Sequence, residues 1–397
     1  MLVAYILDEF PSASEYFILN EIVELVKRGF TIQVLAMRKN NKITGHEIAG
    51  VLYEQGCFSV GTFMAHLYLM RTVRKRYVGM IKKITKLRQL RVFLTGGYFL
   101  FLLRKMPVEH IHAHFCSIPA DIAMIMSELS GIGFSCSAHS RDIFTGNKEG
   151  LRVKINKARF FITCTSYNRL YLQQIAQGDG LGKIFHLYHG IDLAKWPEKK
   201  QGSGPSRHDK VRILTVCRLV GKKGIFFLLE AIKMLRDTGL TIECSIVGEG
   251  PLRREIEKYI DMNGLRCNIH LQGMLLQSAV KPFYLSADIF VLPAIVADDG
   301  DRDGLPNVLV EAMAVGVPVI TTAVSAIPEL VVHEFTGLLV PEKSPEAIRD
   351  AIVRLISEEE LCHKIARNGR RKVKAEFSIH TTTDRMVEIF TSNRQGA

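Results

Sequence analysis

Short apolar runs rich in β-branched residues alternate with helix-length amphipathic segments along most of this chain. The runs VAYIL (3–7) and FTIQVLAM (30–37) flank a segment predicted to be helical from about Glu15 to Arg28, which stops at Gly29. Strands separated by helices are typical of βαβ units, and such units build parallel sheets. The same half of the chain contains four more predicted strands, HIHAHF (110–115), FSCSAH (134–139), FFITCT (160–165) and IFHLYHG (184–190).

The alternation is interrupted once and then resumes. Residues 193–210, LAKWPEKKQGSGPSRHDK, are rich in Gly, Ser, Pro and charge, which predicts an interdomain linker. After it come the predicted strands VRILTVCRL, TIECSIVG, NIHLQG, DIFVLPA and PVITT, with helices around 224–237, 251–263 and 306–315. With 397 residues, two domains of similar size fit the usual domain length of about 150 residues. We predict an N-terminal domain over 1–192, a C-terminal domain over 211–375 and a helix in 376–397 that packs back toward the N-terminal domain.

Composition excludes several classes of protein. The chain is 47% apolar and 23% charged, which rules out a disordered or low-complexity protein. The longest apolar run, VFLTGGYFLFLL (92–103), is shorter than the ~18–20 residues that span a bilayer, and MLVAYILDEF lacks the features of a signal peptide. The eight cysteines are scattered without a CxxC pair, so we expect free thiols and a reducing cytosol.

The net charge of +12 favours anionic partners. Residues 71–91 contain nine Lys or Arg residues and no acidic residue, with apolar residues at roughly helical spacing. A basic amphipathic helix of this kind can lie on anionic lipid, and we expect it to contact a membrane surface through Arg74, Lys75, Arg76, Lys82 and Lys83. A solvated helix face is the alternative. No nucleic-acid-binding motif accompanies the charge, so we do not expect nucleic acid as a partner.

The segment 298–330, DDGDRDGLPNVLVEAMAVGVPVITTAVSAIPEL, is the most informative for chemistry. Pro306 fits the first turn of a helix and Gly316 the position after its end. The free N–H groups at the start of that helix form an anion site, and Glu311 lies within reach of sugar hydroxyls. Asp299, Asp301 and Asp303 also match the start of a calcium-binding loop, but the closing Glu is missing.

Two further segments carry polar residues at predicted sheet edges. In RLVGKKG (218–224), Arg218 and Lys223 follow the first strand after the linker, where α/β folds bind ligands, although a solvated turn is an alternative. IVGEGP (246–251) is a weak match to a dinucleotide fingerprint. His110, His112 and His114 share one face of a strand, which fits satisfied histidines better than a metal site, and His139 follows the next strand.

Together these segments resemble glycosyltransferase family 4, the retaining nucleotide-sugar transferases of the GT-B fold. The similarity extends over nearly the whole chain, through PSASEYFILNEI, HAHF, SAHSRDI, TSYNRLYL, YHGID, RLVGKKGI, VGEGP and GLPNVLVEAMAVGVPV. Within the family, the chain is most similar to bacterial enzymes of exopolysaccharide assembly such as the colanic acid type. The resemblance implies an α/β fold of two facing Rossmann-like domains, each with a parallel sheet, and an interdomain cleft.

The resemblance also implies roles for individual residues. Arg218 and Lys223 would hold the donor diphosphate and stabilise the leaving group. Glu311 would bind the ribose hydroxyls. Asp303 stands where the family has a Glu that contacts the transferred sugar, and His139 would lie near the reacting sugar carbon.

Backbone groups complete the implied donor site. N–H groups around Leu305, Asn307 and the helix start would cradle phosphate, and Gly248 and Gly304 would also line the donor. Ser325-Ala326 replaces a Gly-containing pair that many relatives have at this point.

The implied reaction is transfer of a sugar from a UDP-, GDP- or ADP-sugar to an acceptor hydroxyl, with retention and without a metal or other cofactor. The expected acceptor is a lipid-linked saccharide for cell-surface or extracellular polysaccharide, met at the anionic inner face of the plasma membrane by a cytoplasmic, peripherally bound enzyme. The alternatives are a nucleotide-sugar 2-epimerase and a non-catalytic subunit that binds a sugar nucleotide or membrane.

Overall fold

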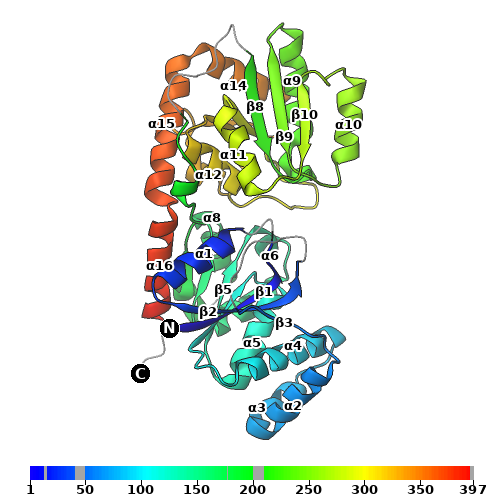
Figure 1. The fold of residues 1–397 in the computed structure, drawn as a ribbon, viewed down its shortest axis with the longest axis vertical. Coiled ribbons are helices and arrows are strands. Elements are labelled where there is room, and N and C mark those ends of the chain that lie inside the picture. The colour runs from blue at the N-terminus through cyan, green and yellow to red at the C-terminus, as the bar shows by residue number, and fades with distance from the viewer. Residues whose placement is uncertain (13–15, 41–49, 177, 200–209, 394–397) are drawn as a thin grey trace. The chain divides into compact units, whose positions relative to one another are not determined.

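The computed structural model describes residues 1–12, 16–40, 50–176, 178–199 and 210–393, and the contacts within it divide the chain into two compact units. Unit 1 comprises residues 1–188 together with those from Thr383 onward, and unit 2 comprises His189–Thr382. Each unit is a parallel sheet covered by helices (Figure 1). Within the described residues, no helix combines the length and hydropathy needed to cross a bilayer.

The sheet of unit 1 has the strand order β3-β2-β1-β4-β5-β6-β7, and every neighbouring pair is parallel. Strands β4 and β5 are buried along their whole length, as expected for central strands with both faces covered. All four strands predicted between residues 110 and 190 are shorter than expected; for example, the chain turns at Phe115 and leaves the sheet after His186. The strands are β1 (Leu2–Phe10), β2 (Thr31–Lys39), β3 (Leu52–Tyr53), β4 (His110–His114), β5 (Phe134–Ala138), β6 (Phe161–Thr163) and β7 (Ile184–His186).

Helices cover both faces of this sheet. Apolar side chains of α1 and α16 form one buried cluster with alternate residues of β1 and β2. Apolar side chains of α4 and α5 form a second buried cluster on the opposite face of the sheet. This cluster includes Ala4 and Ile6 of β1 and Ile111 and Ala113 of β4. The helices are α1 (Tyr16–Lys27), α2 (Val60–Thr72), α3 (Arg74–Ile81), α4 (Leu87–Leu103), α5 (Ile118–Ser130), α6 (Ser140–Phe144), α7 (Lys148–Lys157), α8 (Ser166–Ile175) and α16 (Ile379–Ser392).

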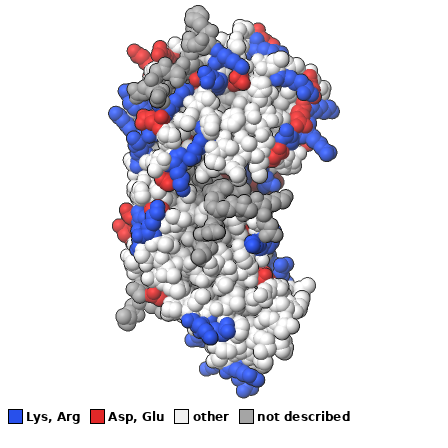
Figure 2. All heavy atoms as spheres, in the orientation of Figure 1, with Lys and Arg blue, Asp and Glu red and all other residues white. Residues whose placement is uncertain are grey.

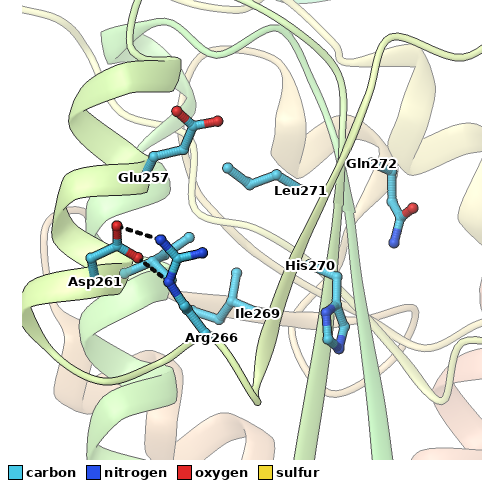
Figure 3. Close-up of a pocket in the computed structure, with 8 residues that line it drawn as sticks. Glu257, Asp261, Arg266, Ile269, His270, Leu271 and Gln272 are labelled. Atoms are coloured by element: carbon cyan, nitrogen blue, oxygen red, sulfur yellow. Dashed lines mark hydrogen bonds and ion pairs between the residues drawn. The ribbon is translucent and has the colours of Figure 1, made fainter.

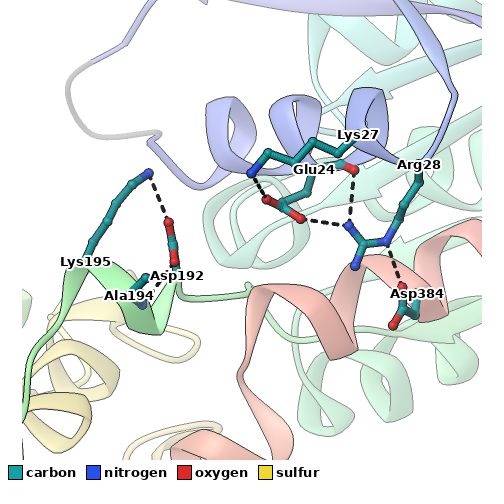
Figure 4. Close-up of polar contacts among 7 residues, drawn as sticks. All are labelled: Glu24, Lys27, Arg28, Asp192, Ala194, Lys195 and Asp384. Carbon is teal, nitrogen blue, oxygen red and sulfur yellow. Dashed lines mark hydrogen bonds and ion pairs between the residues drawn. The ribbon is translucent and has the colours of Figure 1, made fainter.

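The end of the chain returns to unit 1 through α16. Met386, Ile389 and Phe390 are buried in the same cluster as α1. At the surface beside them, Arg28 Nε donates to Asp384 Oδ1 at 2.7 Å, and its guanidinium also contacts Glu24 (Figure 4). Burial of the apolar face of α16, rather than this exposed ion pair, therefore accounts for most of the helix's attachment.

The prediction of one basic amphipathic helix over 71–91 is wrong. Helix α2 ends at Thr72, α3 ends at Ile81, and α4 begins at Leu87. Local hydrogen bonds determine where α4 starts, because the side chain of Gln89 accepts hydrogen bonds from the backbone N–H groups of Thr85 (2.8 Å) and Lys86 (3.1 Å). The apolar residues of the stretch do not share one buried face either: Tyr77 is buried, whereas Leu87 is 78% exposed.

Unit 2 has a six-stranded parallel sheet in the order β10-β9-β8-β11-β12-β13. Its strands are β8 (Val211–Val216), β9 (Ile242–Val247), β10 (Ile269–Gly273), β11 (Ile289–Leu292), β12 (Val319–Thr322) and β13 (Leu338–Val340). Its helices are α9 (Ile225–Asp237), α10 (Arg253–Met262), α11 (Gln277–Ser286), α12 (Asn307–Val315), α13 (Ile327–Leu330), α14 (Pro345–Ser357) and α15 (Glu359–Glu376).

The predicted linker 193–210 is only partly described. Residues 193–199 pack within unit 2, where the apolar ring of Trp196 is buried edge-on against Tyr284. Asp192 begins this stretch by accepting a hydrogen bond from the backbone of Ala194 at 3.1 Å (Figure 4). Residues 200–209 lie outside the described part of the chain.

Candidate active site

The strand order of unit 2 reverses between β8 and β11, and polar side chains gather where these two strands end. From β8 the sheet continues to β9 and β10 on one side and to β11, β12 and β13 on the other. Ligands of open α/β sheets bind at the carboxyl ends of the strands at such a switch point. The loops after β8 and β11 carry Arg218, Lys223 and Asp303, so the topology brings these predicted residues to one edge.

The loop after β8 depends on two glycines of the next strand's loop. A Cβ on Gly248 would collide with the carbonyl of Cys217, and a Cβ on Gly250 would collide with the backbone of Leu219. Leu219 N donates to Glu249 O at 3.0 Å, which holds the two loops together. The glycines of VGEGP therefore allow the Arg218 loop to pack closely against the loop after β9. The resemblance of this segment to a dinucleotide fingerprint did not indicate that packing role.

Two lysines and two aspartates form a compact charge cluster at this edge. Lys223 Nζ lies 2.5 Å from Asp303 Oδ2, and Lys222 Nζ lies 3.1 Å from Asp301 Oδ1 and 3.5 Å from Asp303 Oδ1. Burial disfavours the charged ammonium of Lys223, but the Asp303 carboxylate outweighs this effect and raises the lysine's pKa. Both aspartates are thus paired with lysine ammonium groups in this structure.

Arg218 differs from the lysines because its side chain is exposed and makes no ion pair with a described residue. Of the two predicted diphosphate ligands, the structure thus holds Lys223 against Asp303 and leaves the Arg218 guanidinium open to a ligand.

Helix α12 begins directly after this loop. Asn307 is its first residue, and its Oδ1 lies 3.3 Å from His189 Nδ1. Pro306 is the N-cap residue, one position earlier than predicted, and the carbonyl of the buried Gly304 accepts a hydrogen bond from Ala326 N at 3.2 Å. Leu305 stands between them, half-buried. The helix N-terminus presents free N–H groups at the edge, as an anion site requires.

Glu311 lies on the second turn of α12. Burial raises its pKa to about 7, even though the hydroxyl of Tyr284 donates to Glu311 Oε2 at 2.8 Å and Gln277 also donates to the carboxylate. The carboxyl group is thus poised between its two protonation states near neutral pH. Sequence analysis missed Tyr284, because a tyrosine inside an ordinary helical segment gives no motif.

Ser325 has a backbone conformation that favours glycine. Its φ is +49°, in the left-handed region that glycine occupies without steric cost. Its Oγ is buried and has no hydrogen-bond partner in the described structure. The departure from the family pattern therefore places a side chain where the backbone disfavours one.

In unit 1, His139 directly follows β5 at the carboxyl edge of the sheet. Its ring packs against those of Phe115 and Phe17, with centroids 4.7 and 5.2 Å away. Phe115 has a φ of +72°, which is rare for a bulky residue and marks a strained turn beside the histidine.

Asp142 holds this turn together. One carboxylate oxygen accepts a hydrogen bond from His139 N at 2.8 Å, and the other accepts one from the backbone N–H of Cys116. Burial raises the pKa of Asp142 to about 6, against the lowering effect of these backbone donors. The spacing of SAHSRDI, with an Asp three residues after the His, is the signal that identifies this residue in retrospect.

The three alternating histidines of β4 are buried and hydrogen-bonded. Ser135 Oγ lies 2.7 Å from His110 Nε2 and 2.7 Å from His112 Nδ1, and His114 Nε2 lies 3.0 Å from Glu21 Oε1. Burial lowers the pKa of His110 to about 3, so this ring stays neutral. His114 Nδ1 is buried and has no hydrogen-bond partner among the described residues, and ligand atoms of Glu21, His112 and His114 lie within 4.8 Å of one another.

One open pocket of unit 2 lies away from this site. Residues of helix α10 and of the edge strand β10 line this open cavity, which has a volume of about 570 Å³ (Figure 3). Arg266 spans part of it and pairs with Asp261 at 2.6 Å. No candidate residue of the active site lines this cavity.

Comparison with known proteins agrees with this architecture. Residues 197–372 match the sequence family Glycosyl transferases group 1. The chain is 27% identical to the amylovoran biosynthesis glycosyltransferase AmsK of Erwinia amylovora, over 96% of this chain and 97% of that protein. It is 25% identical to the putative colanic acid biosynthesis glycosyltransferase WcaL of Escherichia coli K12, over 95% and 96% of the two chains.

Solved structures share the fold at low sequence identity. Sucrose-phosphate synthase from Thermosynechococcus elongatus superposes with a TM-score of 0.77 and 17% identity, covering 99% of this chain and 98% of that one. HepE (Alr3699) of Anabaena, solved with UDP and glucose, gives a TM-score of 0.72 and 16% identity, with 99% and 100% covered.

The chain is a glycosyltransferase of the GT-B fold. The segment that matches the family Glycosyl transferases group 1 falls within unit 2, the unit that carries Arg218, the lysine–aspartate cluster and Glu311. The fold class and the enzyme class predicted from the motifs are confirmed.

Proposed function

We propose that this protein transfers a sugar from a nucleoside diphosphate sugar to a saccharide acceptor, with retention at the anomeric carbon, as a member of glycosyltransferase family 4. The observation that carries the proposal is the grouping of an open Arg218, the half-buried Lys223 and the start of α12 at the sheet's switch point. Three sources of positive potential meet there, as a diphosphate requires. The solved complexes of HepE with UDP and UDP-glucose, on the same fold, support a nucleotide-sugar donor.

The roles follow from the contacts of each residue. Arg218 and Lys223 hold the diphosphate and stabilise the negative charge of the leaving group, without a metal. N–H groups at Leu305 and Asn307 contact a phosphate, and the Glu311 carboxylate accepts hydrogen bonds from the ribose. When the donor binds, its diphosphate competes with Asp303 for Lys223, which frees the aspartate to accept a hydrogen bond from the transferred sugar.

The acceptor is a lipid-linked saccharide for an extracellular polysaccharide, used at the cytoplasmic face of the membrane. The relatives AmsK and WcaL, named for amylovoran and colanic acid biosynthesis, support this class of product. His139 is the residue of unit 1 that we assign to the reacting sugar, since Phe115, Phe17 and Asp142 fix its position. Association with the membrane surface uses the cations between Arg74 and Lys83.

A panel of UDP-, GDP-, ADP- and TDP-sugars tests the donor site by thermal shift, with and without magnesium. A donor at 100 times its Kd stabilises the folded protein by about 2.7 kcal/mol. We expect one nucleotide to stabilise the wild type regardless of magnesium, and Arg218→Ala to abolish the shift. Arg212→Ala is the matched control, because this exposed arginine lies on β8 away from its carboxyl end.

Retention and turnover need a second measurement. We expect NMR of the product formed from an α-linked donor to show an α-linkage, at a rate that EDTA does not change. An inverted product, or a rate restored only by added magnesium, contradicts the proposed mechanism. Absence of any nucleotide-dependent shift contradicts the donor site itself.

A further inference from the structure

The segment from Gln55 to Val108 carries nearly all of the chain's excess positive charge. It contains eleven Lys or Arg residues and no Asp or Glu, which leaves 41 basic and 40 acidic residues in the rest of the chain. Lys83 and Arg88 contact Glu128 and Asp121 of α5. The exposed residues that make no ion pair with a described residue include Arg71, Arg74, Lys75, Lys82 and Lys86. Lys and Arg side chains stand among uncharged ones at this end of unit 1 (Figure 2).

The outward face of α2 is apolar. Val60, Phe63 and Met64 follow the spacing of one helix face and are 80%, 69% and 50% exposed. The face turned to the core contains the buried residues Thr62, Ala65, His66 and Leu69. A surface helix normally presents polar residues outward, so this arrangement fits a helix that meets an apolar medium.

An open cavity of about 450 Å³ lies between the start of α2 and helix α4. This volume is within the range of pockets that bind small ligands. Its apolar lining comes from Met37, Cys57, Phe58, Leu87, Leu90 and Leu94. Phe58 and Leu87 are 89% and 78% exposed, so the rim of the cavity is itself apolar and faces solvent.

Three polar side chains line the cavity: Glu54 and Cys57, which are hydrogen-bonded, and Arg91. Glu54 Oε1 accepts hydrogen bonds from Thr95 Oγ1 at 2.9 Å and Cys57 Sγ at 3.3 Å. Burial and the neighbouring Glu54 raise the pKa of the Cys57 thiol, which therefore stays neutral. Arg91 lines the cavity, is exposed, and makes no ion pair with a described residue. An apolar cavity with one open cation fits a hydrocarbon chain attached to a phosphate.

The cavity opens at the catalytic edge of the sheet. Met37 lies near the carboxyl end of β2, and Glu54 directly follows β3. His139 follows β5, and only β1 and β4 separate β5 from β2. With strands about 4.8 Å apart, the carboxyl ends of β2 and β5 are about 14 Å from each other. Met37 packs with the α4–α5 cluster and Phe17, beside His139, packs with the α1–α16 cluster, so an oligosaccharide that joins the two places crosses the sheet edge.

We propose that this cavity binds the hydrocarbon chain of the lipid-linked acceptor, with the lipid phosphate at Arg91 and the outward face of α2 in the membrane surface. The saccharide then extends along the sheet edge toward His139. The inference rests on the proposed function, because it takes the acceptor to be lipid-linked. It adds the apolar face of α2 and the rim residues to the membrane contact that we propose for the cations between Arg74 and Lys83.

Fluorescence of a Phe58→Trp variant tests the site directly. The native tryptophan, Trp196, is buried in unit 2, so the new indole at the rim reports ligand there. The probes are geranylgeranyl phosphate, isopentenyl phosphate with the same head group but a short chain, and geranylgeraniol without phosphate. We expect geranylgeranyl phosphate to shift the emission to the blue and to bind at least about tenfold tighter than the other two.

Matched substitutions in the Phe58→Trp background locate the site. Leu87→Asp places a carboxylate on the rim and should weaken geranylgeranyl phosphate at least about tenfold. Ile81→Asp makes the same change at an exposed residue on α3 that does not line the cavity, and should leave the affinity unchanged. Both positions are exposed, so neither variant disturbs a core.

Three results would overturn the proposal. These are equal affinity for the long- and short-chain phosphates, equal effects of Leu87→Asp and Ile81→Asp, and a response to vesicles of phosphatidylglycerol but not to geranylgeranyl phosphate. The last result would mean contact with a bilayer only. The donor thermal shift is measured separately, so failure of the donor site is distinguishable from failure of this cavity.

Discussion

The sheet edge of unit 2 where we propose that the donor binds, called the donor edge below, and the helical segment of unit 1 both concentrate positive charge, but they hold it in opposite ways. At the donor edge, Lys222 and Lys223 contact Asp301 and Asp303, and the cluster is largely buried. In the helices α2 to α4, most cations are exposed and have no acidic neighbour.

This difference indicates two kinds of anion recognition. A buried lysine held by a carboxylate is already oriented, so a diphosphate has to displace its partner but little side-chain freedom is lost. Exposed cations without partners attract a charged surface over a distance set by the ionic strength, and their effect falls in salt. The first arrangement suits one specific ligand, and the second suits a membrane surface.

Lys223→Met is the strongest test of the paired arrangement. Removing the ammonium should lower turnover about 10³-fold, because the leaving group loses a preorganised cation. It also removes the nearer of the two ammonium partners of the buried Asp303 carboxylate and leaves Lys222 at 3.5 Å, which should lower the free energy of unfolding by about 2 kcal/mol. Steady-state kinetics and urea denaturation measure the two effects.

A double variant separates these effects. Lys223→Met combined with Asp303→Leu should regain most of the stability but none of the turnover. Recovery of turnover in the double variant would mean that Lys223 serves only to neutralise Asp303.

Neutralising the exposed cations tests the other arrangement. Changing Arg74, Lys75, Arg76, Lys82 and Lys83 to Gln should weaken binding to vesicles containing phosphatidylglycerol about 100-fold or more, because each such residue contributes about 1 kcal/mol near the surface. The free energy of unfolding should hardly change, since exposed charges contribute little. Vesicle sedimentation at two salt concentrations measures the effect, and unchanged binding would reject the membrane role.

The protonation of Glu311 distinguishes the two regions, because it makes the stability and the donor affinity of the donor edge depend on pH. Its pKa in the folded protein is raised to about 7, so the stability contributed by the neutral carboxyl is complete below its unfolded pKa of about 4.5 and is lost as pH rises through 7. Relative to Glu311→Gln, the wild type should lose about 2 kcal/mol between pH 4.5 and 8.

The ionised form of Glu311 is the stronger acceptor for ribose hydroxyls, so donor affinity should rise over the same pH range in which stability falls. Urea denaturation and donor titration at several pH values measure the two trends. Parallel pH profiles for the wild type and Glu311→Gln would contradict the assignment.

The smallest expected effect comes from the turn beside Gly304. Ser325→Gly should raise the free energy of unfolding by about 0.5–1 kcal/mol, since glycine accepts the positive φ and removes a buried hydroxyl without a partner. Thermal denaturation checks the sign. A decrease in stability would show that the hydroxyl has a favourable contact in solution.

The sequence predicted the fold because its signals are local. Apolar runs such as VAYIL and helix-length spacers determine βαβ units wherever they occur, and Gly316 ends α12 as predicted. Motif spacing also located Arg218, Lys223 and Glu311, which the switch point then brings to one sheet edge. The prediction of a single helix over 71–91 was wrong because helical periodicity does not reveal that Gln89 caps the start of a new helix or that Tyr77 points inward to His66.

Local patterns thus determined the two parallel sheets, the class of enzyme and the residue types at the donor edge. Only the tertiary structure decided which charges are paired, that Tyr284 meets Glu311, that Asp142 holds His139, and that an apolar cavity opens beside α2. The physical reason is that strand and helix formation depends on neighbours a few residues away. Pairing, burial and pKa depend on residues such as Asp303 and Lys223, which are 80 positions apart and meet only in the folded chain.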